Sequence, residues 1–393
     1  MPPSEIQTNH SIRIIVLFSL GIPLEQWQKT GLAAREKVFY QRFVDKRHQV
    51  SLLTYGKNDL QYQAYWQDIK ILPWIGKMTH FVKYACLAPF YHRAAFKQAE
   101  IVKSNQSQGA LVGVIAKLVN PKLKFVLRCG WVRTKEVIKN EEKRTGARYY
   151  RAVFFEWLAV KLSNAIIVVT QSDADYLISH YSAKAKKIHI IPNSIDTNQY
   201  LYTPSTFQDS LLKKSTIKLL LVGRLVEAKN FHKVIAAVAK IDACIDVSIV
   251  GVGEYQKALI DKASQCAVNV NFLGSVPNDQ LASIYGAHDV VVMPEAWGSG
   301  MPKVVLEAMA SGTMIIASNI RSVRQVVVDG VNGLICEPTE QSIHDKIMKV
   351  IQISSEERLA MLANAKQDID QKYSMDAAVK SELRLFHSLL QNH

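Results

Sequence analysis

Three side chains in the second half of the chain have the types and spacing to bind a phosphorylated ligand. Arg224 follows Gly223 at the end of an apolar run, and Lys229 comes soon after. Cations at the end of a buried strand can clamp a diphosphate and neutralise charge on a leaving group. Glu307 lies in an apolar helical segment, where its carboxylate can accept hydrogen bonds from a ligand's hydroxyl pair. A surface cation pair and a solvated helix glutamate are the alternative interpretations.

A glycine-containing loop precedes Glu307. The stretch 294–312 reads PEAWGSGMPKVVLEAMASG, and the run before it, Asp289–Pro294, is typical of a buried parallel strand. Pro302 stands directly before the expected helix Lys303–Ala310, a place where its missing N–H costs nothing. A strand, a glycine loop and a helix N-terminus together present backbone N–H groups to an anion. The pattern therefore predicts an anion site in this loop.

The elements that position these residues alternate between strands and helices, which predicts α/β architecture with parallel sheets. Ligands of such sheets bind at the carboxyl ends of the strands, which nominates Gly21, Gly31, Arg128 and Gly130 as cleft-lining residues. In the first half we expect strands at Ile12–Leu20, His48–Gly56, Ala110–Ala116, Lys124–Gly130, Ala165–Thr170 and Ile188–Pro192.

The strand–helix pattern restarts after a polar run, Thr203–Lys214, which we interpret as a linker. Gly251 and Gly253 form a lone G-x-G without the third glycine of the dinucleotide fingerprint, so a tight strand-to-helix turn is favoured over a nucleotide loop. The tail after Gln341 is helical by periodicity. Further strands are expected at Thr216–Leu225, Asp246–Val250, Val270–Val276, His288–Pro294 and Thr313–Ser318.

Composition favours a soluble globular protein of two domains. The chain has 393 residues, of which 48% are hydrophobic, with a mean hydropathy near zero. No apolar run approaches the roughly 18–20 residues that a membrane span needs. Ile12–Pro23 is short and lacks a cleavage site, so a first buried strand is favoured over a signal peptide. Five scattered cysteines without a C-x-x-C pair indicate reduced thiols and a cytoplasmic location.

The net charge of +14 is confined to the first half. Residues 1–205 hold 29 Lys and Arg against 14 Asp and Glu. This asymmetry predicts an anionic partner, either a membrane surface, an acidic acceptor or nucleic acid, although no nucleic-acid motif accompanies it. Ile71–Arg93 mixes aromatic with basic residues, which suits the inner face of a membrane or, alternatively, an amphipathic helix packed on the sheet. A merely soluble basic face is the other interpretation of the charge.

Asp173 and Asp175 form an Asp-x-Asp sequence, which binds divalent metal in some sugar transferases. Here the two residues follow an expected strand directly and open an expected helix. Ser and Asp are favoured at helix N-termini because their side chains cap free N–H groups. We therefore favour helix capping and expect no metal site.

Several motifs in the second half together resemble the retaining glycosyltransferases of family 4. They are GRLVEAKNF at Gly223–Phe231, FLGSVPNDQLASIYGAHDVVVMP at Phe272–Pro294, GMPKVVLEAMASG at Gly300–Gly312 and DGVNGLICEP at Asp329–Pro338. The segment His189–Tyr200 is similar to the family's inter-domain segment. The resemblance is specific over residues 165–340 and only general in the first half.

The resemblance implies a GT-B fold, in which two Rossmann-like domains with parallel sheets face each other across a cleft. An acceptor-binding domain would span residues 1–205, a nucleotide-sugar-binding domain 206–375, and a final helix, 376–393, would cross back to the first domain. By resemblance to the family, Arg224 and Lys229 would hold the donor diphosphate and Glu307 would bind the ribose hydroxyls. The nucleotide base, phosphate and sugar would meet Gly223, Gly274, Ser275, Val276, Ser299, Gly300, Met301, Pro302 and Lys303.

One departure from the family concerns its pair of glutamates separated by seven residues. Counting back from Glu307 places Ser299 at the first position, and Glu295 lies four residues earlier. The expected function is transfer of a sugar from a UDP- or GDP-sugar to a glycan or lipid-linked acceptor, without a metal cofactor, in bacterial cell-surface polysaccharide or glycolipid synthesis. The alternatives are a non-catalytic nucleotide-binding subunit, which Ser299 favours, and an epimerase of the same fold.

Overall fold

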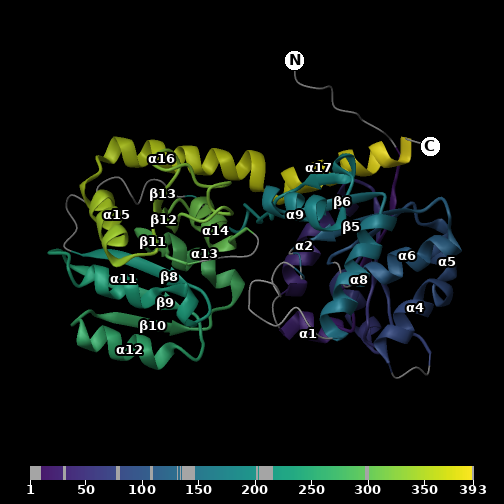
Figure 1. The fold of residues 1–393 in the computed structure, drawn as a ribbon, viewed down its shortest axis with the longest axis horizontal. Coiled ribbons are helices and arrows are strands. Elements are labelled where there is room, and N and C mark those ends of the chain that lie inside the picture. Colours follow the sequence, from purple (N-terminus) through teal and green to yellow (C-terminus); the bar gives the residue numbers. More distant parts are fainter. Residues whose placement is uncertain are drawn as a thin grey trace, which may run out of the picture. The chain divides into compact units, whose positions relative to one another are not determined.

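The computed structural model of the protein describes residues 10–29, 32–76, 80–106, 109–130, 132, 134, 147–200, 202, 216–296 and 301–391 (Figure 1). It divides into two compact units, which are described separately. Unit 1 comprises Met1–Ile191 with Val379–His393, and unit 2 comprises Pro192–Ala378. Gly31, Ser299, Gly300 and the expected linker lie outside the described residues. The roles expected for the two domains stay predictions.

Unit 1 contains a seven-stranded sheet in which every pair is parallel. Its strand order is β3-β2-β1-β4-β5-β6-β7, so the chain reverses its direction of winding between β1 and β4. Ile14 of β1 lies opposite Val50 of β2 on one side and Ile101 of β4 on the other. The strands are β1 Arg13–Leu17, β2 Gln49–Leu53, β3 Lys70–Leu72, β4 Ile101–Ser104, β5 Lys124–Cys129, β6 Ala165–Val168 and β7 Ile188–Ile190.

Helices cover both faces of this sheet because alternate strand residues point to opposite sides. Ile15 and Leu17 belong to the core cluster that also takes residues of α4, α6 and α8. On the other face Phe43 of α2 stacks on Phe386 of α17, with ring centroids 6.2 Å apart. The helices are α1 Leu24–Lys29, α2 Leu32–Asp45, α3 Gln63–Trp66, α4 Phe81–Tyr91, α5 Arg93–Gln98, α6 Ala110–Val119, α8 Ala147–Leu162, α9 Gln171–Tyr181 and α17 Met375–Gln391, with 3-10 turns at η1 Asp59–Tyr62 and η3 Ala185–Lys187.

Unit 2 repeats the same plan with six parallel strands. The order β10-β9-β8-β11-β12-β13 places the change of winding direction between β8 and β11. Leu219 and Leu221 face one core cluster, whereas Leu220 and Val222 face another. The strands are β8 Ile217–Val222, β9 Ile245–Val250, β10 Val270–Gly274, β11 Val290–Met293, β12 Met314–Ser318 and β13 Leu334–Cys336.

The helices of unit 2 pack on both faces of its sheet, and the tail is helical as expected. Helix α16 has a complete capping box, in which Ser354 and Glu357 satisfy each other's backbone N–H groups. The helices are α11 Phe231–Val238, α12 Gln256–Gln265, α13 Asn278–Gly286, α14 Lys303–Ser311, α15 Glu340–Gln352 and α16 Ser355–Asp368, with a 3-10 turn at η5 Glu227–Lys229 and a π-helical turn at η6 Ile369–Tyr373.

One expected strand is wrong. Residues 110–116 belong to helix α6, not to a strand. A short, wholly apolar run does not distinguish a buried helix from a buried strand, and α6 is apolar because it packs on α4, α8 and the sheet. Its Gly113 lies so close to the Phe125 ring that an added Cβ would come within 2.4 Å of it.

Three strands of the structure were not expected. They are β3, β4 and β13, and β4 is central to its sheet. All four residues of β4 are buried, including Lys103 and Ser104, whose polar side chains hide the strand pattern in the sequence. The other two have only three residues each, which is too short for a periodic pattern.

The aromatic–basic segment Ile71–Arg93 contains α4, which has two different faces. Tyr84 is buried and stacks on Trp74 at 4.8 Å between ring centroids, so one face packs into the core. Phe81, Phe90 and Tyr91 are exposed. Within the described residues, no helix is long and apolar enough to cross a membrane.

Candidate functional site

The winding of unit 2 reverses between β8 and β11, and the predicted ligand-binding residues collect at the carboxyl ends of these strands. In doubly wound sheets this switch point is where ligands bind. Gly223 directly follows β8, has a φ of +154°, and donates its N–H to the carbonyl of Val250 at 3.0 Å. Arg224 is exposed at the same edge. The structure thus puts Arg224 where a clamp for an anion is expected.

Lys229 and Glu295 meet at this edge from the two strands. The Lys229 ammonium forms an ion pair with the Glu295 carboxylate, and the side chains are 24% and 11% exposed. Asn230 fixes the two loops together, because its side-chain amide donates to the carbonyl of Pro294 at 2.9 Å. Asn230 also takes the left-handed conformation at the start of α11. Glu295, expected as a cleft residue, therefore contacts Lys229 directly.

The glycines of the G-x-G sequence allow close packing of two loops, in agreement with the interpretation as a tight turn. A Cβ on Gly251 would lie 1.8 Å from the carbonyl oxygen of Gly223, and one on Gly253 would lie 2.2 Å from that of Leu225. The absence of both side chains lets the loop after β9 press against the loop after β8. These glycines shape the turn that carries Arg224.

Glu307 is buried, so the solvated-glutamate interpretation is wrong. Glu307 is 8% exposed, and one of its carboxylate oxygens accepts a hydrogen bond from the Tyr285 hydroxyl at 2.8 Å. Burial first, and then the neighbouring Glu307 carboxylate, raise the pKa of Tyr285 well above its ordinary value. Tyr285 therefore stays a hydrogen-bond donor and holds the carboxylate in one orientation.

The remaining expected contacts lie at the ends of β10 and at the start of α14. Pro302 precedes Lys303, the first residue of α14, and the carbonyl of Met301 accepts a hydrogen bond from Asn193 at 3.4 Å. After β10, Gly274 has a φ of +67°, Ser275 is exposed, and Val276 packs against the core. Ser299 and Gly300 lie outside the described residues.

Unit 1 brings its own candidates to the carboxyl edge of its sheet. Gly21 follows β1 with a φ of +79°, and an added Cβ would lie 3.0 Å from the Phe81 ring. Arg128 lies in β5, where its N–H donates to the Ser104 hydroxyl at 3.2 Å, and Gly130 comes directly after that strand. Gly31, the fourth candidate, lies outside the described residues.

Asp173 takes part in a helix cap, as expected. The N-cap residue of α9 is Thr170, whose hydroxyl accepts from the backbone N–H of Asp173 at 3.1 Å and donates to its carboxylate at 2.6 Å. The half-buried Asp175 accepts a hydrogen bond from the Gln171 side-chain amide at 2.8 Å. Across the described residues, no group of three His, Cys, Asp or Glu side chains has the geometry to hold a metal ion.

Sequence reasoning did not find Tyr285 or Asn230. Both lie in the quoted motifs, but a tyrosine inside an apolar helix reads as core, and an asparagine before a helix reads as a cap. Only the fold brings Tyr285 against Glu307 and Asn230 against the end of β11.

Two family models match the chain. The model described as "Glycosyl transferases group 1" matches residues 203–368, and that described as "Glycosyltransferase Family 4" matches residues 38–199. The chain belongs to the group 1 glycosyltransferases. Its two parallel sheets are those of the GT-B fold, as the sequence motifs predicted.

Relatives of this glycosyltransferase include an uncharacterized glycosyltransferase from Methanocaldococcus jannaschii. The two are 29% identical over 68% of this chain and 72% of the relative. A D-inositol 3-phosphate glycosyltransferase from Corynebacterium urealyticum is 27% identical over 58% of each chain. The chain thus spans between about half and three quarters of the curated relatives it matches.

Solved structures share the fold at low sequence identity. Anabaena HepE in complex with UDP superposes with a TM-score of 0.73 at 17% identity, covering 96% of this glycosyltransferase and 100% of HepE. HepE was also solved in complex with UDP-glucose.

Proposed function

We propose that this glycosyltransferase moves a sugar from a nucleotide-diphosphate donor to a hydroxyl of a glycan or lipid-linked acceptor. The observations that carry the proposal are two cations after β8, of which Lys229 pairs with Glu295 beyond β11, and the buried Glu307 carboxylate on α14, held by Tyr285. Two cations suit a diphosphate, and a buried carboxylate of fixed orientation suits the hydroxyl pair of a ribose. The complexes of Anabaena HepE with UDP and UDP-glucose support a donor of this class.

The proposed reaction retains the configuration of the anomeric carbon. The acceptor hydroxyl attacks this carbon on the face from which the diphosphate leaves. A C–O bond to the acceptor forms, the C–O bond to the diphosphate breaks, and a phosphate oxygen takes the acceptor's proton. Arg224, Lys229 and the backbone N–H groups at the start of α14 stabilise the departing charge, so no covalent enzyme intermediate is needed.

Glu295 is proposed to replace the first glutamate of the family motif. Its carboxylate sits beside the Lys229 ammonium, where it fixes the cation and lies near the leaving group and the transferred sugar. Ser299 occupies the motif position by sequence but carries no charge. Glu295→Gln should therefore lower kcat by about 10²-fold or more, while Ser299→Ala should change it only a few fold. The reverse order would assign the role to Ser299.

The proposed chemistry requires no metal, because Arg224 and Lys229 supply the positive charge that the leaving diphosphate needs. Transfer should persist in excess EDTA, and Arg224→Ala should lower kcat by about 10²–10³-fold, as for other lost transition-state donors. Activity that disappears with EDTA and returns with Mg²⁺ would overturn this part of the proposal.

A thermal-shift panel of UDP, GDP, ADP and their sugar conjugates tests donor binding. A ligand at 100 times its Kd stabilises the native state by about 2.7 kcal/mol. We expect a shift with one nucleotide that Glu307→Ala abolishes. A shift that survives this substitution would place the nucleotide elsewhere, and no shift with any nucleotide would reject the donor class.

A non-catalytic nucleotide-binding subunit is the second candidate, and Ser299 in the motif position favours it. Tight nucleotide binding without donor hydrolysis or sugar transfer to any acceptor would support it. Label transfer to an acceptor would exclude it and would also separate a transferase from an epimerase.

The acceptor is proposed to be lipid-linked and reached at the cytoplasmic face of a membrane, as in synthesis of bacterial cell-surface glycans. The positive charge of residues 1–205 and the exposed aromatic side chains of unit 1 support this. These side chains are Phe81, Phe90 and Tyr91 on α4, and Tyr150, Phe154, Phe155 and Trp157 on α8.

Vesicle co-sedimentation tests the membrane proposal. The protein should bind vesicles that contain phosphatidylglycerol, bind less at high salt, and bind less after Phe154→Ser with Trp157→Ser. Circular dichroism and Tm measurements would verify the fold of this variant. Binding that depends on neither anionic lipid nor salt would reject the proposal.

A further inference from the structure

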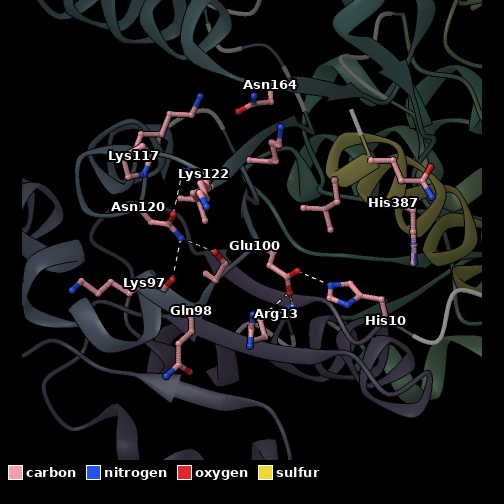
Figure 2. Close-up of a pocket in the computed structure, with 16 residues that line it drawn as sticks. His10, Arg13, Lys97, Gln98, Glu100, Lys117, Asn120, Lys122, Asn164 and His387 are labelled. Atoms are coloured by element: carbon pink, nitrogen blue, oxygen red, sulfur yellow. Dashed lines mark hydrogen bonds and ion pairs between the residues drawn. The ribbon is translucent and has the colours of Figure 1, made fainter. Parts of the chain in front are cut away.

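A cavity of about 710 Å³ opens at the amino edge of the unit 1 sheet, away from the strand ends that carry Arg128 and Gly130. Its volume falls within the roughly 300–1,000 Å³ of ordinary ligand sites. The wall comes from residues just before β1, β4, β5 and β6, from the ends of α5 and α6, and from the end of α17 (Figure 2). Nothing in the proposed sugar transfer uses this cavity.

The lining of the cavity is strongly basic. Five cationic side chains contribute to it, and the only carboxylate among its lining residues is Glu100. Glu100 bonds to the ring of His10 at 2.6 Å and to the backbone N–H of Arg13 at 3.1 Å, so it is occupied at one side of the cavity. The cations are Arg13, Lys97, Lys117, Lys122 and Lys124.

Capping of helix ends accounts for Lys117, whose ammonium reaches the carbonyl of Leu162 at the end of α8, but not for Lys97 or Lys122. The carbonyls at the end of α5 already accept from the Asn120 amide, at 3.1 Å for Phe96 and 2.9 Å for Ala99. Within the described part of the chain, Lys97 and Lys122 are exposed and form no ion pair with a carboxylate. Figure 2 shows Lys117 and Lys122 beside Asn120. Lys97 and Lys122 therefore present positive charge that the fold does not need for itself.

Lys117 is perturbed by burial and by two neighbouring cations. Burial first, and then the charges of Lys187 and Lys124, lower the pKa of Lys117. The Lys117 ammonium reaches the carbonyl of Leu162 at 3.2 Å, which holds it at the cavity wall. An anion in the cavity would relieve this repulsion, because each opposite charge within about 4–6 Å favours the protonated ammonium.

We propose that this cavity, lined by Lys97, Lys117 and Lys122, is a second anion site that binds a phosphate-bearing ligand. Lysine ammonium groups bind phosphate as point charges without demanding one fixed geometry, and the Asn120 and Asn164 side chains add polar groups at the wall. The ligand carries two or more negative charges, since five cationic residues line one cavity. Its source is either a soluble polyphosphate compound or the headgroup of an anionic lipid.

Calorimetric titration of the full chain with sodium tripolyphosphate tests the proposal. Arg224→Ala serves as the background, because the proposed donor site also attracts phosphates. Lys122→Glu should weaken binding by about tenfold or more, as should Lys97→Glu. Lys57→Glu is the matched control, since Lys57 is an exposed lysine of unit 1 outside the cavity. The control should bind as the background protein does.

A parallel arm with phosphatidylglycerol and phosphatidylcholine vesicles separates the two sources. Binding of tripolyphosphate that depends on Lys122 supports a soluble ligand, and Lys122-dependent binding of anionic vesicles alone supports a lipid headgroup. Equal affinities for Lys122→Glu and Lys57→Glu in both arms would overturn the proposal, as would no binding in either. Tm values equal to that of the background would verify that the variants fold.

Discussion

Gly251 and Gly253, just after β9, allow the loop after β9 to pack directly on the loop that carries Arg224. An added Cβ at Gly251 would overlap the carbonyl oxygen of Gly223, and Gly251 has a φ of +141°. We predict that Gly251→Ala lowers the free energy of unfolding by about 3 kcal/mol or more, from overlap and backbone strain together. Urea unfolding measures this.

Gly286→Ala is the matched control for this prediction. Its added Cβ meets no atom within 4 Å, and Gly286 ends helix α13. The control should change stability by less than about 1 kcal/mol. Equal stability of both variants would show that the loop after β9 moves freely and does not press on the loop that carries Arg224.

Tyr285 is expected to orient Glu307. Tyr285→Phe removes a buried hydrogen bond to a carboxylate, and we predict a loss of about 1.5–3 kcal/mol in the free energy of unfolding, with weaker binding of UDP. Tyr200→Phe is the control, because Tyr200 lies in the same core cluster and its hydroxyl bonds to no described residue. Urea unfolding and UDP titration measure both effects. A larger loss for the control would contradict the assignment.

Residue types and spacing predicted part of this site. Arg224 and Lys229 follow an apolar run and Glu307 lies within one, so their charge and position single them out as candidates in the sequence. The pairing of Lys229 with Glu295 joins residues far apart in the chain, in the segments that follow β8 and β11, so no local pattern encodes it. The hydrogen bond from Tyr285 to Glu307 likewise joins two elements, α13 and α14, and no local pattern encodes it.

At the scale of elements, strand β4 and helix α17 are joined by a buried ion pair. The Lys103 ammonium bonds to both carboxylate oxygens of Glu382, at 2.7 and 2.6 Å, and each side chain is 1% exposed. Lys103→Met leaves a buried carboxylate unpaired, so we predict a loss of about 3–5 kcal/mol in the free energy of unfolding.

The double variant Lys103→Met with Glu382→Leu should recover most of that loss, because two apolar side chains can replace a buried pair. Lys29→Met, which breaks an exposed pair with Glu25, is the control and should leave stability nearly unchanged. Denaturant unfolding of the parent and these three variants measures the recovery. A double variant as unstable as the single one would mean that the pair is not what joins β4 to α17.

This ion pair also explains why β4 escaped prediction. A lysine in the middle of a central strand contradicts the apolar pattern of such strands, and its partner lies 279 residues away on the last helix. The prediction failed for helix α6 for the opposite reason, since Lys117 is the one polar side chain among its ten residues. Strands such as β8 and β11, which carry only local apolar signals, were predicted within three residues at each end.

At the scale of the whole molecule, both sheets are parallel and both reverse their winding once, between β1 and β4 and between β8 and β11. The alternation of strands and helices predicts this class without any knowledge of function. It does not predict the strand order, which depends on how long each connection is and which faces remain to be covered. The excess positive charge of the first half likewise does not reveal that a cavity concentrates part of it.

Five buried or half-buried histidines of the described residues predict how the stability of the fold depends on pH. Burial is the first cause that lowers the pKa of His48, His92, His189, His232 and His387 below the ordinary value of about 6.5. Just below that pH the unfolded chain binds protons that the folded chain does not. The free energy of unfolding therefore falls as the pH falls from 7.5 to 5.5.

This pH window differs from that of the carboxylates. Burial raises the pKa of Asp329, but the N–H of Ile335 and Lys346 outweigh it and lower this pKa below its ordinary value. Paired carboxylates of this kind lose their contribution to the free energy of unfolding only near pH 4 and below. We expect Tm to drop between pH 7.5 and 5.5, before the carboxylates titrate. His92→Gln should reduce this drop, because His92 contacts the carbonyl of Pro73 at 2.9 Å and glutamine keeps a donor there without titrating. A Tm that rises on acidification, or a His92→Gln profile parallel to that of the parent, would show that the buried histidines do not set the acid sensitivity of the fold.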